Sequence, residues 1–188
     1  MSANVRAPVL GSVGGIYLDL VVRPQGNFAP ISACLADVIS DTDTVDSLFI
    51  AWEAARCRWG AAVDSLSIGL SDTSHTLLKS RRWMVEGDSL GLAAFLSIAM
   101  HFQRYFFGYR RVVATGAIEW HAGSFRVRSV GGVKQKFRGA CREHESGATA
   151  IVVPWANVSD LDVRCCVHDV WLAGPDLGCF RSHVTERE

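Results

Sequence analysis

The chain has 188 residues, of which 49% are hydrophobic and 20% charged, a composition typical of a folded globular domain. Its 19 basic and 19 acidic residues cancel, which argues against nucleic acid or an anionic membrane as a partner bound by bulk electrostatic attraction. The longest apolar run, Leu90–Met100, is too short to span a bilayer, since a spanning helix needs about 20 residues.

The ends and the cysteines of the chain predict its organisation and location. Residues 1–8 carry one basic residue and precede no long apolar stretch, so no secretory signal is indicated. The six cysteines show no C-x-x-C spacing, which favours reduced thiols and a cytoplasmic protein without a metal site or cofactor. The pair Cys165-Cys166 is a poor ligand set because neighbouring strand residues point to opposite faces. We expect one domain over 13–178, between tails at 1–12 and 179–188.

In the first half of the chain, hydrophobic periodicity predicts alternating strands and helices. Alternation predicts a strand over 16–22 and, after a turn at 23–27, a second strand over 29–34 that Pro30 restricts to a sheet edge. Apolar residues at helical spacing predict a helix over 45–59, which Asp43 or Thr44 would cap and Gly60 would end.

The remaining elements follow from the same patterns. A strand is predicted at 66–70, and the polar, basic stretch 72–86 shows no clear element. A helix from about Ser89 to Gln103 is apolar nearly all round and is therefore expected to be buried. Further strands at 111–120, 125–130, 148–153 and 163–167, with a helix from Gly131 to about Glu145, complete an α+β domain with helices layered on a sheet.

A serine and a lysine stand where helices begin. Ser89, in Gly87-Asp88-Ser89-Leu90-Gly91, lies at a helix N-terminus, where free N–H groups can stabilise an oxyanion formed by attack on a carbonyl. The simpler interpretation is that Asp88 or Ser89 is only a helix cap. Lys134 follows Gly131-Gly132 in the first turn of another helix, where the dipole and burial would lower its pKa and make it a usable base. The simpler interpretation of Lys134 is a solvated surface lysine.

Four motifs in one order resemble the proteolytic domain of Lon proteases. In that family, a D-G-P-S-A-G element precedes a T-G-E strand, a G-G-(L/V)-K-x-K helix start and an I-P-x-x-N-x-x-D-L segment. The matching segments here cover about 13–175, most clearly at 86–93 and 112–161; they are Glu86-Gly87-Asp88-Ser89-Leu90-Gly91, Thr115-Gly116-Ala117, Gly131-Gly132-Val133-Lys134-Gln135-Lys136, and Val153-Pro154 with Asn157 and Asp160-Leu161.

The resemblance implies a Ser-Lys peptidase on the ribosomal protein S5 domain 2-like fold. Ser89 takes the position of the nucleophile and Lys134 that of the general base, with Thr115, Glu86, Asp88 and Gly87 as supporting residues. It also implies an extended polypeptide substrate that pairs by strand addition, and a homo-oligomeric ring, commonly a hexamer.

The sequence departs from the family pattern at two positions of the site. Asp88 replaces a proline beside the serine, and Ala117 replaces the acid of T-G-E. The chain has no G-x-x-x-x-G-K-(S/T) loop, so we expect ATP-independent cleavage of unfolded chains, or service to a separate ATPase partner. We also expect a resting state in which Asp88 helps to keep Ser89 and Lys134 apart.

Two other functions remain open from the sequence. One is an inactive Lon-like module that binds protein or nucleic acid, suggested by the altered serine segment and by the basic set Arg126, Arg128, Lys134, Lys136 and Arg138. The other is an ester hydrolase, since Gly87-Asp88-Ser89-Leu90 spells the G-D-S-L signature. That motif is normally N-terminal and paired with D-x-x-H, and neither His168 nor His183 follows an aspartate at this spacing.

Overall fold

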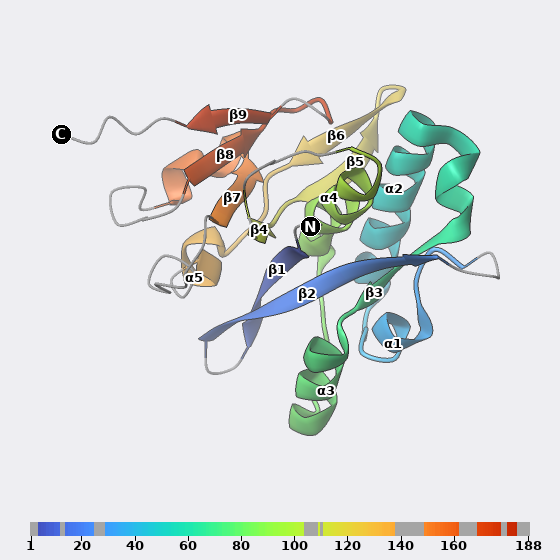
Figure 1. Ribbon diagram of the computed structural model, residues 1–188. Helices are drawn as coiled ribbons and strands as arrows, with labels where there is room; N and C mark the ends of the chain where they lie inside the picture. The colour runs from blue at the N-terminus through green and yellow to red at the C-terminus, as the bar shows by residue number, and fades with distance from the viewer. Residues whose placement is uncertain are drawn as a thin grey trace.

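A computed structural model describes residues 4–11, 14–24, 29–103, 109, 111–137, 149–161, 169–177 and 180–183. Within these residues the fold is mixed α+β. A seven-stranded sheet has the order β3-β2-β1-β4-β7-β8-β9, and a separate two-stranded sheet is formed by β5 and β6 (Figure 1). Among the described residues, no helix combines the length and apolar character needed to cross a bilayer.

The centre of the large sheet is parallel and its margins are antiparallel. Strands β4 (Arg111–Ala114), β7 (Thr149–Pro154) and β8 (Asp169–Ala173) run parallel to β1 (Asn4–Gly11). Antiparallel partners are β2 (Gly14–Pro24) on β1, β3 (Leu66–Leu70) on β2, and β9 (Phe180–His183) on β8.

The expectation of terminal tails is wrong at both ends. Residues 4–11 form β1, which pairs with both β2 and β4 and buries Val5 and Ala7. Residues 180–183 form β9 at the sheet edge. Alternation of apolar residues is weak at both ends, and the pairing partners that stabilise these short strands lie elsewhere in the chain.

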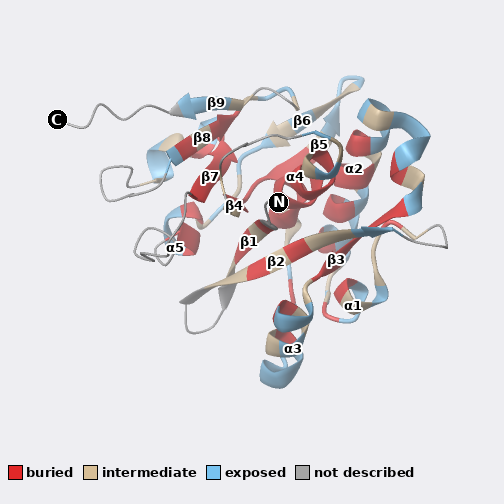
Figure 2. Ribbon diagram, in the orientation of Figure 1, coloured by how far each residue is buried: buried red, intermediate tan, exposed pale blue. Residues whose placement is uncertain are grey.

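Helices cover both faces of the sheet, because side chains of a strand alternate between the faces. Val112 and Ala114 of β4 join the core beneath α4 (Gly91–Phe102), which packs on α2 (Thr42–Trp59). Val113, between them, packs instead with Phe137 of α5 (Val133–Phe137). As expected from its apolar circumference, α4 is almost entirely buried (Figure 2).

Two local predictions in the first half of the chain are corrected. The strand expected at 29–34 is a single bridge from Ile31 to Ile68 followed by the short helix α1 (Ala33–Ala36). The polar stretch 72–86 contains α3 (Asp72–Arg81), whose first turn is capped by Ser71. Polar helices of this kind have little hydrophobic periodicity, so the pattern could not show it.

The strand expected at 111–120 is divided. Thr115 and Gly116 interrupt it, and β5 (Ala117–His121) leaves the large sheet to pair with β6 (Ser124–Arg128). The start of α2 also differs: Asp41 caps it, one residue before the helix, rather than Asp43 or Thr44, whereas its end at Gly60 is as predicted. The strand expected at 163–167 lies outside the described residues. The same is true of the part after Phe137 of the helix that was expected from Gly131 to about Glu145.

Candidate functional site

The serine lies in a turn that leads directly into the most buried helix of the protein. Ser89 belongs to the 3₁₀ turn η2 (Asp88–Leu90), which continues into α4 at Gly91. Gly87 precedes it with φ of 89°, a conformation that favours glycine. Because α4 is fixed by the core, the position of Ser89 is fixed with it.

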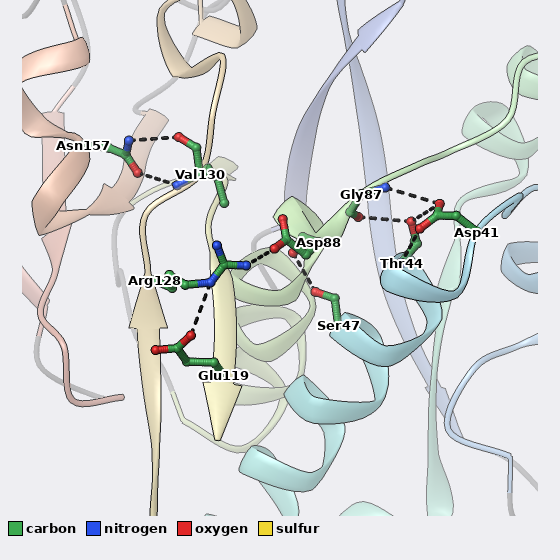
Figure 3. A network of polar contacts seen from close by, with 9 residues as sticks. All are labelled: Asp41, Thr44, Ser47, Gly87, Asp88, Glu119, Arg128, Val130 and Asn157. Carbon is green, nitrogen blue, oxygen red and sulfur yellow. Dashed lines mark hydrogen bonds and ion pairs between the residues drawn. The ribbon is translucent and has the colours of Figure 1, made fainter. Parts of the chain in front are cut away.

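Helix α2 holds the segment before the serine from one side (Figure 3). The Ser47 hydroxyl donates to the carbonyl oxygen of Asp88 at 2.6 Å, and the Thr44 hydroxyl donates to that of Gly87 at 3.0 Å. The Gly87 N–H donates to the Asp41 carboxylate at 3.3 Å. The backbone of residues 87 and 88 is therefore anchored to the first two turns of α2.

The break between β4 and β5 holds the serine from the other side. The carbonyl oxygen of Ser89 accepts from the Gly116 N–H at 3.1 Å and from the buried Thr115 hydroxyl at 3.4 Å. The Leu92 N–H donates to the Gly116 carbonyl at 2.8 Å. Thr115, expected as a supporting residue of the site, thus contacts the backbone of Ser89 itself.

Glycine is needed at position 91 because three elements meet there. A Cβ atom on Gly91 would lie 2.7 Å from the Ser47 hydroxyl oxygen and 3.1 Å from the Ile118 nitrogen. Both distances are shorter than ordinary van der Waals contacts. The absence of a side chain lets α2 and β5 approach the first turn of α4.

Ser89 lines a hollow of about 690 Å³ together with Val9 of β1 and Ile16 of β2. One wall is the extended segment that leads from α3 to the serine, and the opposite wall contains the glycine pair before α5. The lining residues are Val9, Ile16, Leu78, residues 82–89, Val130, Gly131, Gly132 and Lys136.

Of the two lysines after the glycine pair, Lys136 and not Lys134 belongs to this hollow. Lys136 is only 7% exposed and lines the hollow with Ser89. Lys134 is exposed and lines a different hollow with Gln135 and Asp160. Two residues along a helix turn the side chain by about 200°, so only one of the pair can face the serine.

The prediction of Lys134 as the general base is therefore not supported by its position. A signal in the sequence could have distinguished the two lysines: Val133 and Phe137, spaced by four residues, mark the buried face of α5, and Lys136 adjoins it. The structure also explains the separation of Ser89 and Lys134 without Asp88, since residue 134 stands on the outer face of the helix.

The environment of Lys136 disfavours its charged form. Burial lowers the pKa of its ammonium group from the ordinary value, while attraction to the Asp88 carboxylate acts in the opposite direction. A lysine with a lowered pKa has a larger neutral fraction near neutral pH and can accept a proton.

Asn157 fixes the turn that leads into α5. Its side chain forms a two-way clamp on Val130: the Val130 N–H donates to Oδ1 and Nδ2 donates to the Val130 carbonyl oxygen, both at 3.0 Å (Figure 3). The same Nδ2 also donates to Asp160 at 2.7 Å. Asn157, in the 3₁₀ turn η3 (Trp155–Asp160), is 4% exposed and thereby sets where Gly131, Gly132 and Lys136 lie.

Asp88 turns its carboxylate to a residue that the sequence motifs did not single out as part of the site. Arg128, at the end of β6, donates to Asp88 Oδ2 and forms an ion pair with Glu119 of β5 at 3.3 Å (Figure 3). Cross-strand pairing placed these charges together, and it could not be read from the chain without the register.

The remaining predicted residues have simpler surroundings. Glu86 is exposed, accepts from the Ser40 hydroxyl at 2.8 Å and lines the hollow. Within the described part of the chain, no group of three or more histidine, cysteine or acidic residues could hold a metal ion. Among the described residues that line the serine's hollow there is no histidine, the residue that an ester hydrolase of the G-D-S-L type would need beside its serine.

The basic set suggested by the sequence does not form one free face. Arg128 is engaged with Asp88 and Glu119, Lys136 is buried, and Lys134 points into another hollow. Arg138 lies outside the described residues. The basic set therefore gives little support for a nucleic-acid-binding surface.

Comparisons with known proteins do not assign a family. No family model matches the chain, and no curated protein matches it significantly. The candidate site therefore stands on its own geometry: a serine at a helix start and a desolvated lysine lining one hollow.

Proposed function

We propose that this protein is an ATP-independent serine peptidase of the Lon type, with Ser89 as nucleophile and Lys136 as general base. The observation that carries the proposal is the shared hollow, in which Ser89 and the buried Lys136 come from different elements. Among the described residues that line the hollow, the buried Lys136 supplies an amine that, in its neutral form, is suited to activate a serine hydroxyl.

The residues can perform acyl transfer in two balanced steps. Ser89 Oγ attacks the peptide carbonyl carbon, its proton passes to Lys136 Nζ, and the carbon–nitrogen bond then breaks as the amine leaves with that proton. Water next attacks the ester carbon, its proton passes through the same amine, and Ser89 Oγ is regained. The N–H groups that open the helix at residues 88–90 supply donors for the oxyanion.

An extended polypeptide is the substrate that fits the wall of the hollow. Val85 pairs on one edge only, with its N–H donating to Val38 at 2.7 Å and its carbonyl accepting from Ser40 at 3.3 Å. Neighbouring residues of an extended segment present their backbone groups to the other edge, so Met84 and Glu86 offer theirs to the hollow that they line. A substrate strand added there would run toward Ser89.

The test compares two lysines that stand two residues apart. Cleavage of a fluorescently labelled unfolded protein, without ATP, is measured for Ser89→Ala, Lys136→Gln and the matched control Lys134→Gln. We expect Ser89→Ala and Lys136→Gln to lose about 10²–10⁴-fold in rate, as loss of a nucleophile or general base does, and Lys134→Gln to stay within about twofold.

Other outcomes would change the proposal in defined ways. Undiminished cleavage by Ser89→Ala would remove the serine mechanism. Loss of cleavage in Lys134→Gln with retention in Lys136→Gln would restore the base assigned from the sequence motif. The absence of cleavage in the wild-type protein, together with Ser89-independent capture of an unfolded chain, would favour a binding module, a function for which Asp88 beside the serine is the motive.

A further inference from the structure

A carboxylate adjacent to a proposed nucleophile needs a counter-charge that keeps it out of the reaction. Asp88 precedes Ser89 directly and lines the same hollow as Lys136. Asp88 interacts with two cations: the Lys136 ammonium, which lines the hollow, and the Arg128 guanidinium from β6. In the structure the carboxylate pairs with Arg128 (Figure 3).

The position of Arg128 is itself determined by a second carboxylate. Glu119 lies on β5 and Arg128 on β6, and the register pairs Glu119 with Arg126, so Glu119 and Arg128 are diagonal neighbours on one face of the hairpin. Their ion pair, at 3.3 Å, directs the guanidinium between the two acids. The guanidinium is always charged, so this arrangement does not change with pH in the physiological range.

The ion pairs are poor candidates for a purely stabilising role. The side chains of Asp88, Arg128 and Glu119 are 39%, 46% and 43% exposed, and exposed ion pairs contribute little to folding stability. The backbone of Asp88 is already anchored through its carbonyl oxygen to Ser47. The additional effect of Arg128 is to orient the Asp88 carboxylate.

The orientation of the Asp88 carboxylate affects the protonation of Lys136. The charged and titratable groups on the elements that pack on α5 are Arg6, Tyr17, Asp19, Arg23 and Asp160, with Lys134 on α5 itself. Those among the other residues that line the hollow are Arg82, Glu86 and Asp88. Arg6 and Asp19 pair with each other, the Tyr17 hydroxyl donates to the Lys136 carbonyl oxygen, and Asp160 accepts from Asn157. Asp88 is the group whose charge favours the ammonium form of Lys136.

Resting on the proposed function, we infer that Arg128 is a positioning residue that holds the Asp88 carboxylate away from Lys136 and so leaves the lysine free to act as a base. Without the guanidinium, the carboxylate is free to turn toward the Lys136 ammonium, a cation with which it already interacts. The lysine is then held in the protonated form, which cannot accept the proton of Ser89. Arg128 contacts neither substrate nor reacting atoms in this account.

The test measures the protonation of Lys136 directly, independent of catalysis. The protein is labelled with ¹³C-lysine, the Lys136 signal is identified by its loss in Lys136→Gln, and its pH titration is followed by NMR in four proteins: wild type, Arg128→Gln, Asp88→Asn and the double variant. We expect Arg128→Gln to raise the Lys136 midpoint by about one pH unit, the effect of a close opposite charge, and Asp88→Asn to lower it.

The double variant separates direction of a carboxylate from the simple loss of a positive charge. We expect Arg128→Gln to have a much smaller effect when Asp88 is already asparagine, because no carboxylate is left to turn. An equal shift in both backgrounds, or no shift in either, would overturn the inference. The matched control is Arg126→Gln on the same strand, for which the described part of the chain shows no side-chain ion pair; it should leave the midpoint unchanged.

Cleavage measured across pH distinguishes this inference from the proposed function. We expect the alkaline rise in rate to move with the NMR midpoint in Arg128→Gln. Ser89-dependent cleavage with an unmoved midpoint would overturn the inference alone, and a moved midpoint in a protein that never cleaves would overturn the peptidase alone. Should Arg128→Gln fail to fold, Arg128→Met in the wild-type and Asp88→Asn backgrounds decides: the midpoint should rise only where Asp88 is present, and an equal shift in both backgrounds or no shift in either contradicts the inference. Arg128→Lys should retain the wild-type midpoint.

Discussion

The two sides of the hollow are held very differently. The serine side is fixed by contacts from α2 and from the β4–β5 break: three hydroxyls, a carboxylate and a backbone N–H all bind the segment 87–89. On the lysine side, Asn157 clamps Val130 ahead of the glycine pair, while the rest of α5 is held by its buried face and by the Tyr17 hydroxyl. The difference teaches that several elements hold the turn that carries Ser89, whereas one buried amide holds the segment that leads into α5.

The largest effect should therefore come from Asn157→Ala. The change removes a buried side chain and leaves both backbone groups of the half-buried Val130 without their partner, which we expect to cost about 2–4 kcal/mol in the free energy of unfolding. Urea denaturation measures it. Ser47→Ala, which removes one of several contacts on the serine side, is the control and should cost about 1 kcal/mol. Equal losses of unfolding free energy in the two variants would contradict the difference between the two sides of the hollow.

A smaller effect is expected at the contact between α2, β5 and the serine helix. Gly91→Ala places a Cβ atom 2.7 Å from the Ser47 hydroxyl oxygen and should cost about 1–3 kcal/mol in unfolding free energy. In a Ser47→Ala background the same change should cost less, because the nearest obstruction is gone, although the Ile118 nitrogen at 3.1 Å still resists it. Strict additivity in a double-mutant cycle would show that Ser47 does not obstruct a Cβ atom at position 91.

The smallest effect is expected at Asp41, which caps α2 and also accepts from Gly87. Asp41→Ala should lower the unfolding free energy by about 1 kcal/mol near neutral pH, and Asp41→Asn by less, since asparagine also caps helices. Burial alone would raise the pKa of Asp41, but hydrogen bonds from Thr44 and Gly87 lower it on balance.

The sign of the pH dependence follows from that direction. A carboxyl with a pKa lowered in the folded state stabilises the protein above its unfolded pKa and loses that contribution as pH falls through the folded value. The difference in stability between wild type and Asp41→Ala should therefore shrink on acidification. A difference that stays constant from neutral to acidic pH would show that the carboxylate does not act as a charged cap.

Local apolar spacing and the position of a glycine were enough to predict several elements of the fold from the sequence. The buried helix after Ser89, the strand at 66–70 and the helix end at Gly60 follow from local apolar spacing and a glycine. The strand at 4–11 and the helix at 72–81 were missed because non-local pairing stabilises the first and the second is largely polar. Local patterns do not encode such partners.

The candidate site, like the fold, could be predicted only in part from the sequence. Ser89 could be singled out because a helix start and its chemistry are local features. Choosing between Lys134 and Lys136 needed the rotation of a helix that begins beside a glycine pair, and the roles of Arg128 and Asn157 needed the register of two strands and the approach of a distant turn. Arg128, Lys136 and Asn157 lie 39, 47 and 68 positions after Ser89 in the sequence. The fold brings Lys136 to the hollow that Ser89 lines, and it places Arg128 and Asn157 in contact with two other lining residues, Asp88 and Val130.

The most direct test of the central claim, that Ser89 and Lys136 act on one reacting atom, is a crystal structure of the protein with a peptide boronic acid. We expect boron bonded to Ser89 Oγ, with Lys136 Nζ within hydrogen-bond reach of about 3 Å of that oxygen and Lys134 still exposed to solvent. An adduct in which Lys136 stays buried away from Ser89 Oγ, or in which Lys134 approaches it instead, would contradict the account.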